Sequence, residues 1–189
     1  MRDLFHGELV RLTMEEPDSQ AKVEVHWQRD SEFHRLADMD PAMMFSEKVL
    51  KKWAEDKVEK GFDPKRYSFS VHTLEEDKYI GFFSMWVDLI HSDAFIGIGI
   101  GNRDFWGKGY GTEMMKLALQ YAFLELNLYR VSLGLHAYNP RALRSYEKAG
   151  FRLEGRTRKD VLREGRRTDG LWMGILRDEW EALQAGGEI

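Results

Sequence analysis

The spacing of apolar residues predicts strands at three places in the first half of the chain. Apolar and polar side chains alternate over Glu8–Thr13 and again over Tyr67–Thr73, which is the period-two pattern of a half-buried strand. The charged turn Glu75–Asp77 follows the second segment, and another strand is expected to begin near Tyr79. The last two segments together predict a β-hairpin.

Two helices are predicted between these strands. Pro17–Gln28 has apolar side chains at helical spacing. A second helix is expected from Ser46 to about Lys60, because serine is a good N-cap residue and Gly61 supplies a stop.

The second half of the chain alternates strands with helices. Its predicted elements are strands over Ala94–Gly101, Arg130–Ala137, Phe151–Lys159 and Thr168–Leu176, and helices over Tyr110–Leu126 and Pro140–Lys148. Such alternation indicates an α/β or α+β fold built on a mixed sheet.

Glycine recurs at every second position of the strand Ala94–Gly101. The sequence Ala-Phe-Ile-Gly-Ile-Gly-Ile-Gly places isoleucines on one face and glycines on the other. Each glycine weakens regular structure by ~0.5–1 kcal/mol relative to alanine, so the bare face needs a reason. Two reasons are open: the close approach of a ligand, or the tight packing of a helix.

Composition adds limits to this pattern. The 189 residues fit one domain, here residues 1–189, and the 43% hydrophobic and 32% charged content is that of a globular protein. The absence of cysteine excludes disulfides, thiolate metal ligands and a cysteine nucleophile. Met1–Val10 does not resemble a signal peptide, and no apolar run approaches the ~20 residues that span a bilayer. We therefore expect a soluble cytoplasmic protein without a membrane partner.

The charge distribution argues against a nucleic-acid partner. Net charge is −4, whereas proteins that bind the phosphate backbone usually carry a basic surplus. The acidic surplus lies in the first 80 residues. It could attract a cationic substrate or could simply be a solvated surface. The six histidines have no partner spacing that suggests a metal site, so no metal is expected.

The turn Trp106–Thr112 carries the strongest chemical signal. Three glycines in five positions allow backbone N–H groups to turn inward, and the N-terminus of the predicted helix lies directly behind them. This arrangement suits a diphosphate. It is not a P-loop, because Lys108 is followed by Gly109, and it is not a dinucleotide fingerprint, because the third glycine comes one residue early.

The turn and its flanking elements resemble motif A of the GNAT acetyltransferase superfamily. In that family Gln/Arg-x-x-Gly-x-Gly/Ala holds the pyrophosphate of acetyl-CoA. Gly109 and Gly111 match this pattern, but Trp106 stands where the family usually has Gln or Arg. The change removes one polar side chain and leaves the backbone donors in place.

A second segment, Asn139–Phe151, is similar to the family's motif B, Asn-x-x-Ala-x-x-x-Tyr-x-Lys-x-Gly-Phe. Both motifs occur in the expected order. The resemblance covers about residues 7–180 and is most specific from Ile96 to Gly155. Within the superfamily, Leu126–Trp180 most resembles the ribosomal-protein N-terminal and polyamine acetyltransferases. The resemblance implies a single GNAT-like domain with a mostly antiparallel sheet flanked by helices.

The resemblance also implies a set of site residues. The backbone of Gly99, Ile100 and Gly101 would pair with the pantetheine arm and acetyl carbonyl of acetyl-CoA. The turn residues Gly107, Lys108, Gly109, Tyr110, Gly111 and Thr112 would hold the pyrophosphate. On the second motif, Asn139 would hydrogen-bond the pantetheine, and Arg144, with Arg141 and Lys148, would help with the phosphates. Tyr146 would protonate the departing CoA thiolate as general acid, while the amine attacks the thioester directly.

The general base is less well defined by the sequence. Some relatives use a glutamate on the strand before motif B, but the equivalent residue here is Gly134. His136 shares its face of the strand and has a suitable ordinary pKa of ~6.5, although a structural role is the more common one for such a histidine. Asp88, Asp93 or a chain of waters are the alternatives.

The acceptor and the assembly stay open. Protein N-termini, polyamines, amino acids and aminoglycoside-like drugs are all candidates, and relatives often form homodimers. The charged segment Glu154–Asp169 could lie at the acceptor side or be a plain hairpin. Some of the aromatic residues before the glycine-rich turn could line an acceptor pocket, although most are expected in the core: Phe82, Phe83, Trp86 and Phe95. Two other interpretations compete with an active N-acetyltransferase: a non-catalytic acyl-CoA-binding module, and an enzyme that uses a different phosphate-bearing ligand.

Overall fold

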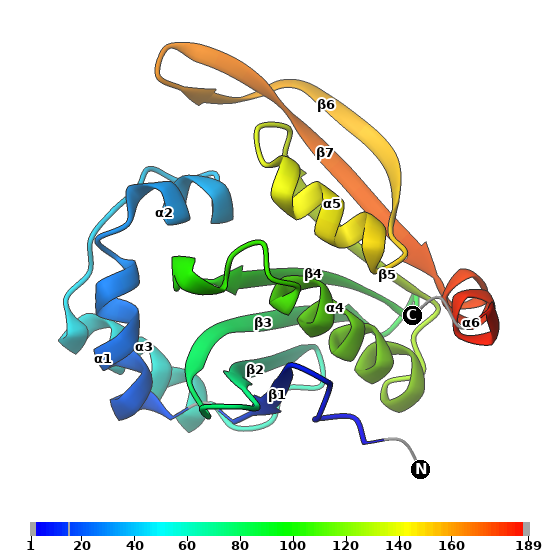
Figure 1. Ribbon diagram of the computed structural model, residues 1–189, viewed down its shortest axis with the longest axis horizontal. Helices are drawn as coiled ribbons and strands as arrows, with labels where there is room; N and C mark the ends of the chain where they lie inside the picture. Colours follow the sequence, from blue (N-terminus) through cyan, green and yellow to red (C-terminus); the bar gives the residue numbers. More distant parts are fainter. Residues whose placement is uncertain (1–2, 15, 187–189) are drawn as a thin grey trace.

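The computed structural model describes residues 3–14 and 16–186. Their core is a seven-stranded sheet in the order β1-β2-β3-β4-β5-β7-β6 (Figure 1). All neighbouring strands are antiparallel except β4 and β5, which are parallel. The strands are β1 Val10–Thr13, β2 Arg66–Thr73, β3 Tyr79–Asp88, β4 Asp93–Ile100, β5 Arg130–His136, β6 Arg152–Arg163 and β7 Arg166–Leu176. The predicted mixed, mostly antiparallel fold is confirmed.

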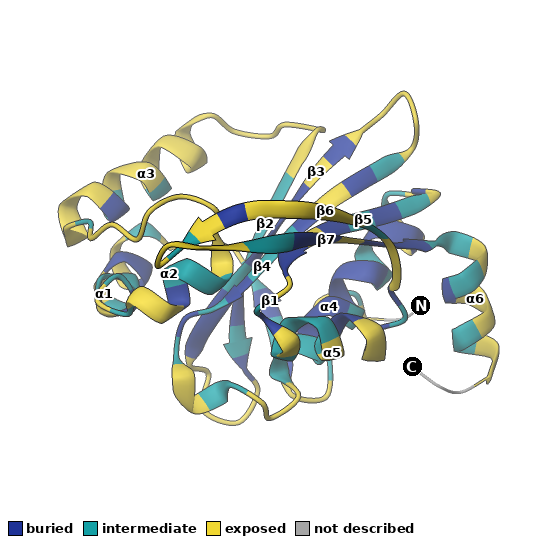
Figure 2. Ribbon diagram, turned by 90° about the horizontal axis from the view of Figure 1, so that it is seen from above, coloured by how far each residue is buried: buried dark blue, intermediate teal, exposed yellow. Residues whose placement is uncertain are grey.

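Helices cover the sheet unevenly. They are α1 Pro17–Trp27, α2 Ser31–Ala37, α3 Glu47–Glu59, α4 Tyr110–Gln120, α5 Pro140–Lys148 and α6 Arg177–Gly186. Helices α4 and α5 lie along one face, and α1 to α3 gather at the end of the sheet away from α6 (Figures 1 and 2). The main core fills the space between α4 and the sheet and contains Met114, Met115, Leu119, Ile96, Leu133 and Met173. Because the opposite face has less helical cover, part of it faces solvent.

The parallel pairing of β4 with β5 is short. Only Asp93–Phe95 pairs with Arg130–Ser132, and the Ser132 hydroxyl donates to the Ala94 carbonyl at 3.2 Å. Beyond this point the two strands separate, while β4 stays paired with β3 up to Ile100. The sheet therefore opens along its middle.

Most of the predicted elements are present, with differences at their ends. The predicted helix Tyr110–Leu126 is α-helical only to Gln120, and Tyr121–Glu125 forms a π-helical turn closed by a bond from the Leu126 N–H to the Tyr121 carbonyl. The last two strands are longer than expected and form one extended hairpin. Helices α2 and α6 were not predicted. The seven residues of α2 are too few to show a period, and α6 follows β7 without a break.

The bare glycine face of β4 has a packing reason at its end. A Cβ at Gly101 would overlap the ring of Trp27, which ends α1, and one at Gly99 would lie 3.0 Å from the Phe82 ring. Trp27 and Phe33 form a small buried cluster with Tyr79 beside this strand. Helix packing, one of the two alternatives, is therefore confirmed at Gly101.

Gly101→Ala should destabilise the fold. The new methyl group must displace a buried indole, and overpacking of this kind costs ~1–3 kcal/mol of unfolding free energy. Gly155→Ala is the matched control, because no atom lies within 4 Å of its Cβ position. Urea unfolding monitored by tryptophan fluorescence measures both. Equal midpoints for the two variants would contradict the packing at Gly101.

Candidate active site

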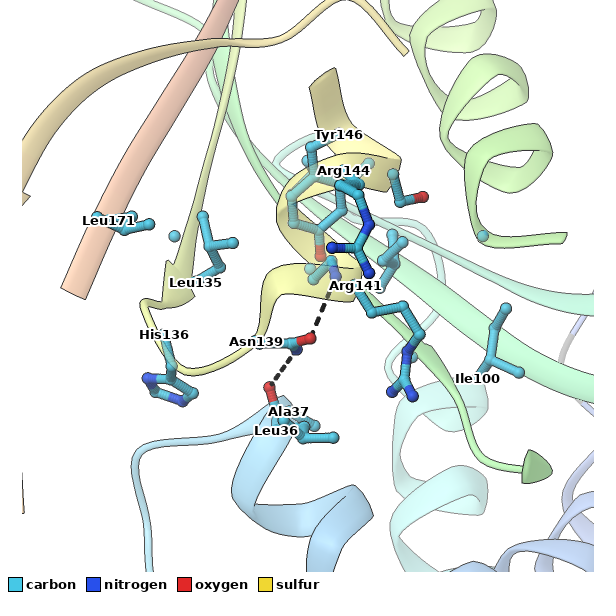
Figure 3. Close-up of a pocket in the computed structure, with 18 of the residues that line it drawn as sticks. Leu36, Ala37, Ile100, Leu135, His136, Asn139, Arg141, Arg144, Tyr146 and Leu171 are labelled. Atoms are coloured by element: carbon cyan, nitrogen blue, oxygen red, sulfur yellow. Dashed lines mark hydrogen bonds between the residues drawn. The ribbon is translucent and has the colours of Figure 1, made fainter. Parts of the chain in front are cut away.

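A cleft of about 540 Å³ occupies the opening between β4 and β5. The N-terminus of α4, helix α5 and the end of α2 form its walls (Figure 3). Antiparallel pairing alternates its hydrogen bonds, and the Gly101 N–H donates to the Ile80 carbonyl of β3 at 3.0 Å. The backbone groups of Ile98 and Ile100 therefore point to the β5 side, where β5 no longer pairs with them. The N–H and carbonyl of Ile98 and the N–H of Ile100 face the cleft without a partner on β5, whereas the Ile100 carbonyl accepts the indole N–H of Trp106.

The glycine-rich turn forms an uncapped helix N-terminus at the cleft. Gly107 and Gly109 have φ of 73° and 95°, a left-handed conformation that favours glycine. Gly109 is the N-cap of α4, and it offers no side-chain acceptor to the first N–H groups of the helix. Gly111 lies within the first turn, where its Cβ would approach Ser145 to 3.4 Å. The N–H groups and the dipole of α4 are thus available to an anion.

Trp106 holds this turn against β4. Its indole N–H donates to the Ile100 carbonyl at 2.7 Å, and the Arg141 guanidinium lies 3.7 Å from its ring centroid. Arg103 approaches the same ring at 5.1 Å and is bound by Asp30. The residue that departs from the usual motif therefore links the turn, β4 and α5.

Asn139 caps α5 and connects it to α2. Its side-chain oxygen accepts the Ala142 N–H at 3.1 Å, and its amide nitrogen donates to the Leu36 carbonyl at 3.5 Å (Figure 3). Burial of the side chain beside the cleft makes this cap part of the wall. A role toward pantetheine stays a prediction.

Tyr146 lies on α5 with its ring buried and its hydroxyl directed toward the cleft (Figure 3). The hydroxyl has no hydrogen-bond partner among residues 3–14 and 16–186. Burial disfavours the phenolate and raises the pKa of Tyr146 to about 12. The phenol is therefore fully protonated at neutral pH and can donate.

His136 ends β5 at the opposite wall. Its Nε2 lies 3.1 Å from the Asp38 carbonyl, and its ring stacks on Tyr138 with centroids 4.9 Å apart. A carbonyl only accepts, so Nε2 carries the proton and Nδ1 keeps a lone pair. Burial lowers the pKa of His136 below its ordinary value, although the Asp38 carbonyl acts in the opposite direction. The imidazole is neutral at pH 7.

The structure brings most of the predicted site residues together. The cleft is lined by Gly99, Ile100, Gly107, Gly109, Gly111, Thr112, His136, Asn139, Arg144 and Tyr146. The other three predicted residues lie outside it: Gly101 faces Trp27, Lys108 is exposed, and Tyr110 packs on Phe105 with ring centroids 5.0 Å apart.

The two alternative carboxylates also lie outside the cleft. Asp88 accepts the N–H groups of Ile90 and His91 at the tip of the β3–β4 hairpin, and these bonds lower the pKa of its carboxyl. Asp93 begins β4 next to Arg130, at the paired end of the two strands. Of the named candidates, only His136 lines the cleft.

The hairpin of β6 and β7 closes the cleft from above, which the sequence left undecided. At its tip, Arg163 donates to the carbonyls of Asp38, Met39 and Asp40 at 2.9–3.0 Å, and Glu164 pairs with Arg35 of α2 at 2.6 Å. The segment Glu154–Asp169 therefore packs over the loop after α2. Helix α2 was not predicted as a wall of the cleft, although Asp30, which caps it, is a usable signal for a helix start.

Comparison with known protein families identifies the family of this chain. Residues 11–152 match the family model described as an acetyltransferase (GNAT) domain. The chain belongs to the GNAT acetyltransferase family and is an acetyl-CoA-dependent N-acetyltransferase.

Three similar proteins are named as N-acetyltransferases. The chain is 29% identical to an uncharacterized N-acetyltransferase of Bacillus subtilis, over 70% of this chain and 72% of that protein. It is 36% identical to a probable N-acetyltransferase of the same organism, over 61% of this chain and 64% of the other. It is 33% identical to a spermidine N(1)-acetyltransferase of Vibrio cholerae, over 50% of this chain and 54% of the other.

Solved structures share the fold. A spermidine N-acetyltransferase from Vibrio cholerae, in complex with CoA and spermine, superposes with a TM-score of 0.78 at 22% identity. The superposition covers 91% of this chain and 98% of that one. Separately, none of the helices in the described part of the chain has the length and apolar content to cross a membrane.

The depressed pKa of His136 predicts a pH dependence of stability. As pH falls, the unfolded state takes up the proton first, so the contribution of neutral His136 is complete above about pH 6.5 and declines below it. The unfolding free energy of the wild type minus that of His136→Gln should shrink by at most ~1.4 kcal/mol per pH unit below that point. Urea titrations from pH 8 to pH 5 measure it, with the exposed His26→Gln as control. A difference that grows toward low pH would contradict the burial of a neutral imidazole.

Proposed function

We propose that the protein transfers the acetyl group of acetyl-CoA directly to a primary amine, with Tyr146 as the general acid. The observation that carries the proposal is a protonated, unpartnered phenol in the cleft that also contains an uncapped helix N-terminus. Acetyl transfer from acetyl-CoA to an amine uses both features: the phenol can protonate the leaving sulfur, and the helix N-terminus can bind the diphosphate of the donor.

The residues of the cleft fit acetyl-CoA. The open backbone groups, which are the Ile98 N–H and carbonyl and the Ile100 N–H, suit the amide-bearing pantetheine arm, because each amide can replace a missing strand bond. The turn Gly107–Thr112 offers N–H groups to the diphosphate. Arg144 and Lys148 line the same wall and supply positive charge for the phosphates. These roles are proposals for the residues named.

The reaction breaks the thioester C–S bond and forms a C–N bond. The sulfur leaves with the electron pair and takes a proton from Tyr146. The nitrogen, which arrives as an ammonium, gives up two protons: one to the base before attack, and one after attack that restores the phenol of Tyr146. In water, where thiols have a pKa near ~8.5, a phenol with a raised pKa would be a weak proton donor to a thiolate. The apolar surroundings that disfavour the phenolate also disfavour the thiolate, so both proton affinities rise together.

His136 is the proposed acceptor of the amine proton. Its Nδ1 keeps a lone pair because Nε2 is held by the Asp38 carbonyl. Gly134, which replaces the family's glutamate, lies two residues earlier on the same face. An α-amine, with a pKa near ~8, needs little assistance from such a base, whereas an amine near ~10.4 needs more.

Tyr146→Phe tests the proposal. The variant loses the donor and keeps the ring, so kcat should fall by ~10²–10⁴, the usual contribution of a general acid, while the Kd for acetyl-CoA changes little. CoA release with a panel of amines measures turnover. Tyr129→Phe is the matched control, because that ring is half exposed at the start of β5 and away from the cleft.

Two outcomes would contradict the proposal. Full activity of Tyr146→Phe would remove the general acid. Tight binding of acetyl-CoA without turnover of any amine would instead favour a binding module.

A further inference from the structure

The sheet face opposite α4 and α5 carries few large side chains around the cleft. On β4 and β5 this face presents Phe95, Gly97, Ser132 and Gly134, and their neighbours point into the core. Glycines at 155 and 170 continue the bare surface on β6 and β7. Apart from Phe95, these small side chains leave the sheet backbone open, and it forms a shallow floor.

Three aromatic rings lie on this floor, and we call them the aromatic platform: Trp86, Phe95 and Trp172. They come from β3, β4 and β7, and adjacent ring centroids are 6.2 Å apart. Their exposures are 43%, 39% and 47%, so the three rings form one contiguous exposed apolar patch, which is typical of a binding surface.

The glycines allow the rings to lie against the sheet. A Cβ at Gly97 would lie 3.5 Å from the Trp86 ring, and one at Gly134 would lie 3.5 Å from Trp172 and 3.8 Å from Phe95. A side chain longer than a methyl group at position 134 would share its space with two of the rings. The platform therefore lies where some relatives carry a glutamate.

The platform belongs to the same cleft as Tyr146 and His136. The charged groups at its cleft end are Asp38, Asp160 and Arg163, which shares the Asp38 carbonyl with His136. The Asp38 carboxylate accepts the Asp40 N–H at 3.2 Å. Asp160 lies under Gly170, whose strand partner is His136, and it has no hydrogen bond or ion pair to another described residue. At the outer end, the Arg66 guanidinium lies 5.8 Å from the Trp86 ring.

We infer that the acceptor is a primary amine joined by a short spacer to an aromatic group. The aromatic group would stack on the platform, and the ammonium would meet Asp160 beside His136 before losing its proton. The inference rests on the proposed function and specifies its acceptor. The bonds are those of the transfer above: the C–S bond breaks and the C–N bond to this amine forms.

The same charges argue against a polyamine. Several ammonium groups need several carboxylates, and this end of the cleft offers one that is unengaged. Arg66 places a positive charge at the far end of the platform, where a second ammonium would lie. Aromatic rings attract cations, so the test includes spermidine explicitly.

The experiment compares acceptors at saturating acetyl-CoA: tryptamine, phenethylamine, the dipeptide Phe-Gly, n-butylamine and spermidine. The inference predicts a kcat/KM for at least one aromatic amine that exceeds those for n-butylamine and spermidine by ~10-fold or more, mostly through KM. The first two amines and the dipeptide separate a small arylalkylamine from a peptide N-terminus. Spermidine or n-butylamine equal to the best aromatic amine would overturn the inference and leave the proposed function standing. No turnover of any amine would overturn both.

Trp172→Ala links the preference to the platform. Its KM for the best aromatic amine should rise by ~10-fold, and Trp172→Phe should recover part of the loss. The KM for acetyl-CoA reports whether each variant is folded. Trp53→Ala is the matched control, since Trp53 on α3 is also 47% exposed but does not line the cleft. An unchanged KM for the aromatic amine in Trp172→Ala, or an equal rise in Trp53→Ala, would overturn the inference.

Discussion

The structure depends on one short parallel pairing. Three residues of β4 pair with three of β5. Beyond them these two strands separate, while β4 stays paired with β3. A separated strand edge leaves strong backbone donors and acceptors without partners, which a protein tolerates only where water or a ligand can satisfy them. The cleft, the helix N-terminus beside it and the wall made by α5 are all arranged around this opening.

The residues that depart from the family pattern are explained by packing. Trp106 replaces a polar side chain, and its indole N–H instead fixes the turn to the Ile100 carbonyl. Gly134 replaces a carboxylate, and aromatic rings occupy the space above it. The change at position 134 leaves room for the aromatic platform, whereas Trp106 packs at the glycine-rich turn. Both leave the uncapped N-terminus of α4 and the protonated Tyr146 in place.

Much of this architecture could be predicted from the sequence, because its signals are local. The glycines at 107 and 109 predicted the inward turn of backbone N–H groups, and the helix Pro140–Lys148 was predicted with its observed bounds. The wall formed by α2 could not be predicted, since a seven-residue helix has no period and its position depends on distant bonds to Arg163 and Asn139. The aromatic platform was predicted only in part, since Trp86 and Phe95 are among the aromatics of which some could line an acceptor pocket. Trp172 lies far along the chain from both, and only the register of four strands brings the three rings together.

The most direct test of this account is hydrogen exchange at single amides of β4, with and without acetyl-CoA. The Ile98 N–H faces the opening, whereas the Gly99 N–H points toward β3 and is already bonded in the antiparallel ladder. Acetyl-CoA should slow exchange at Ile98 by an order of magnitude or more and change Gly99 little. Protection confined to the first amides of α4, with Ile98 unchanged, would contradict the claim that the open strand edge binds the donor.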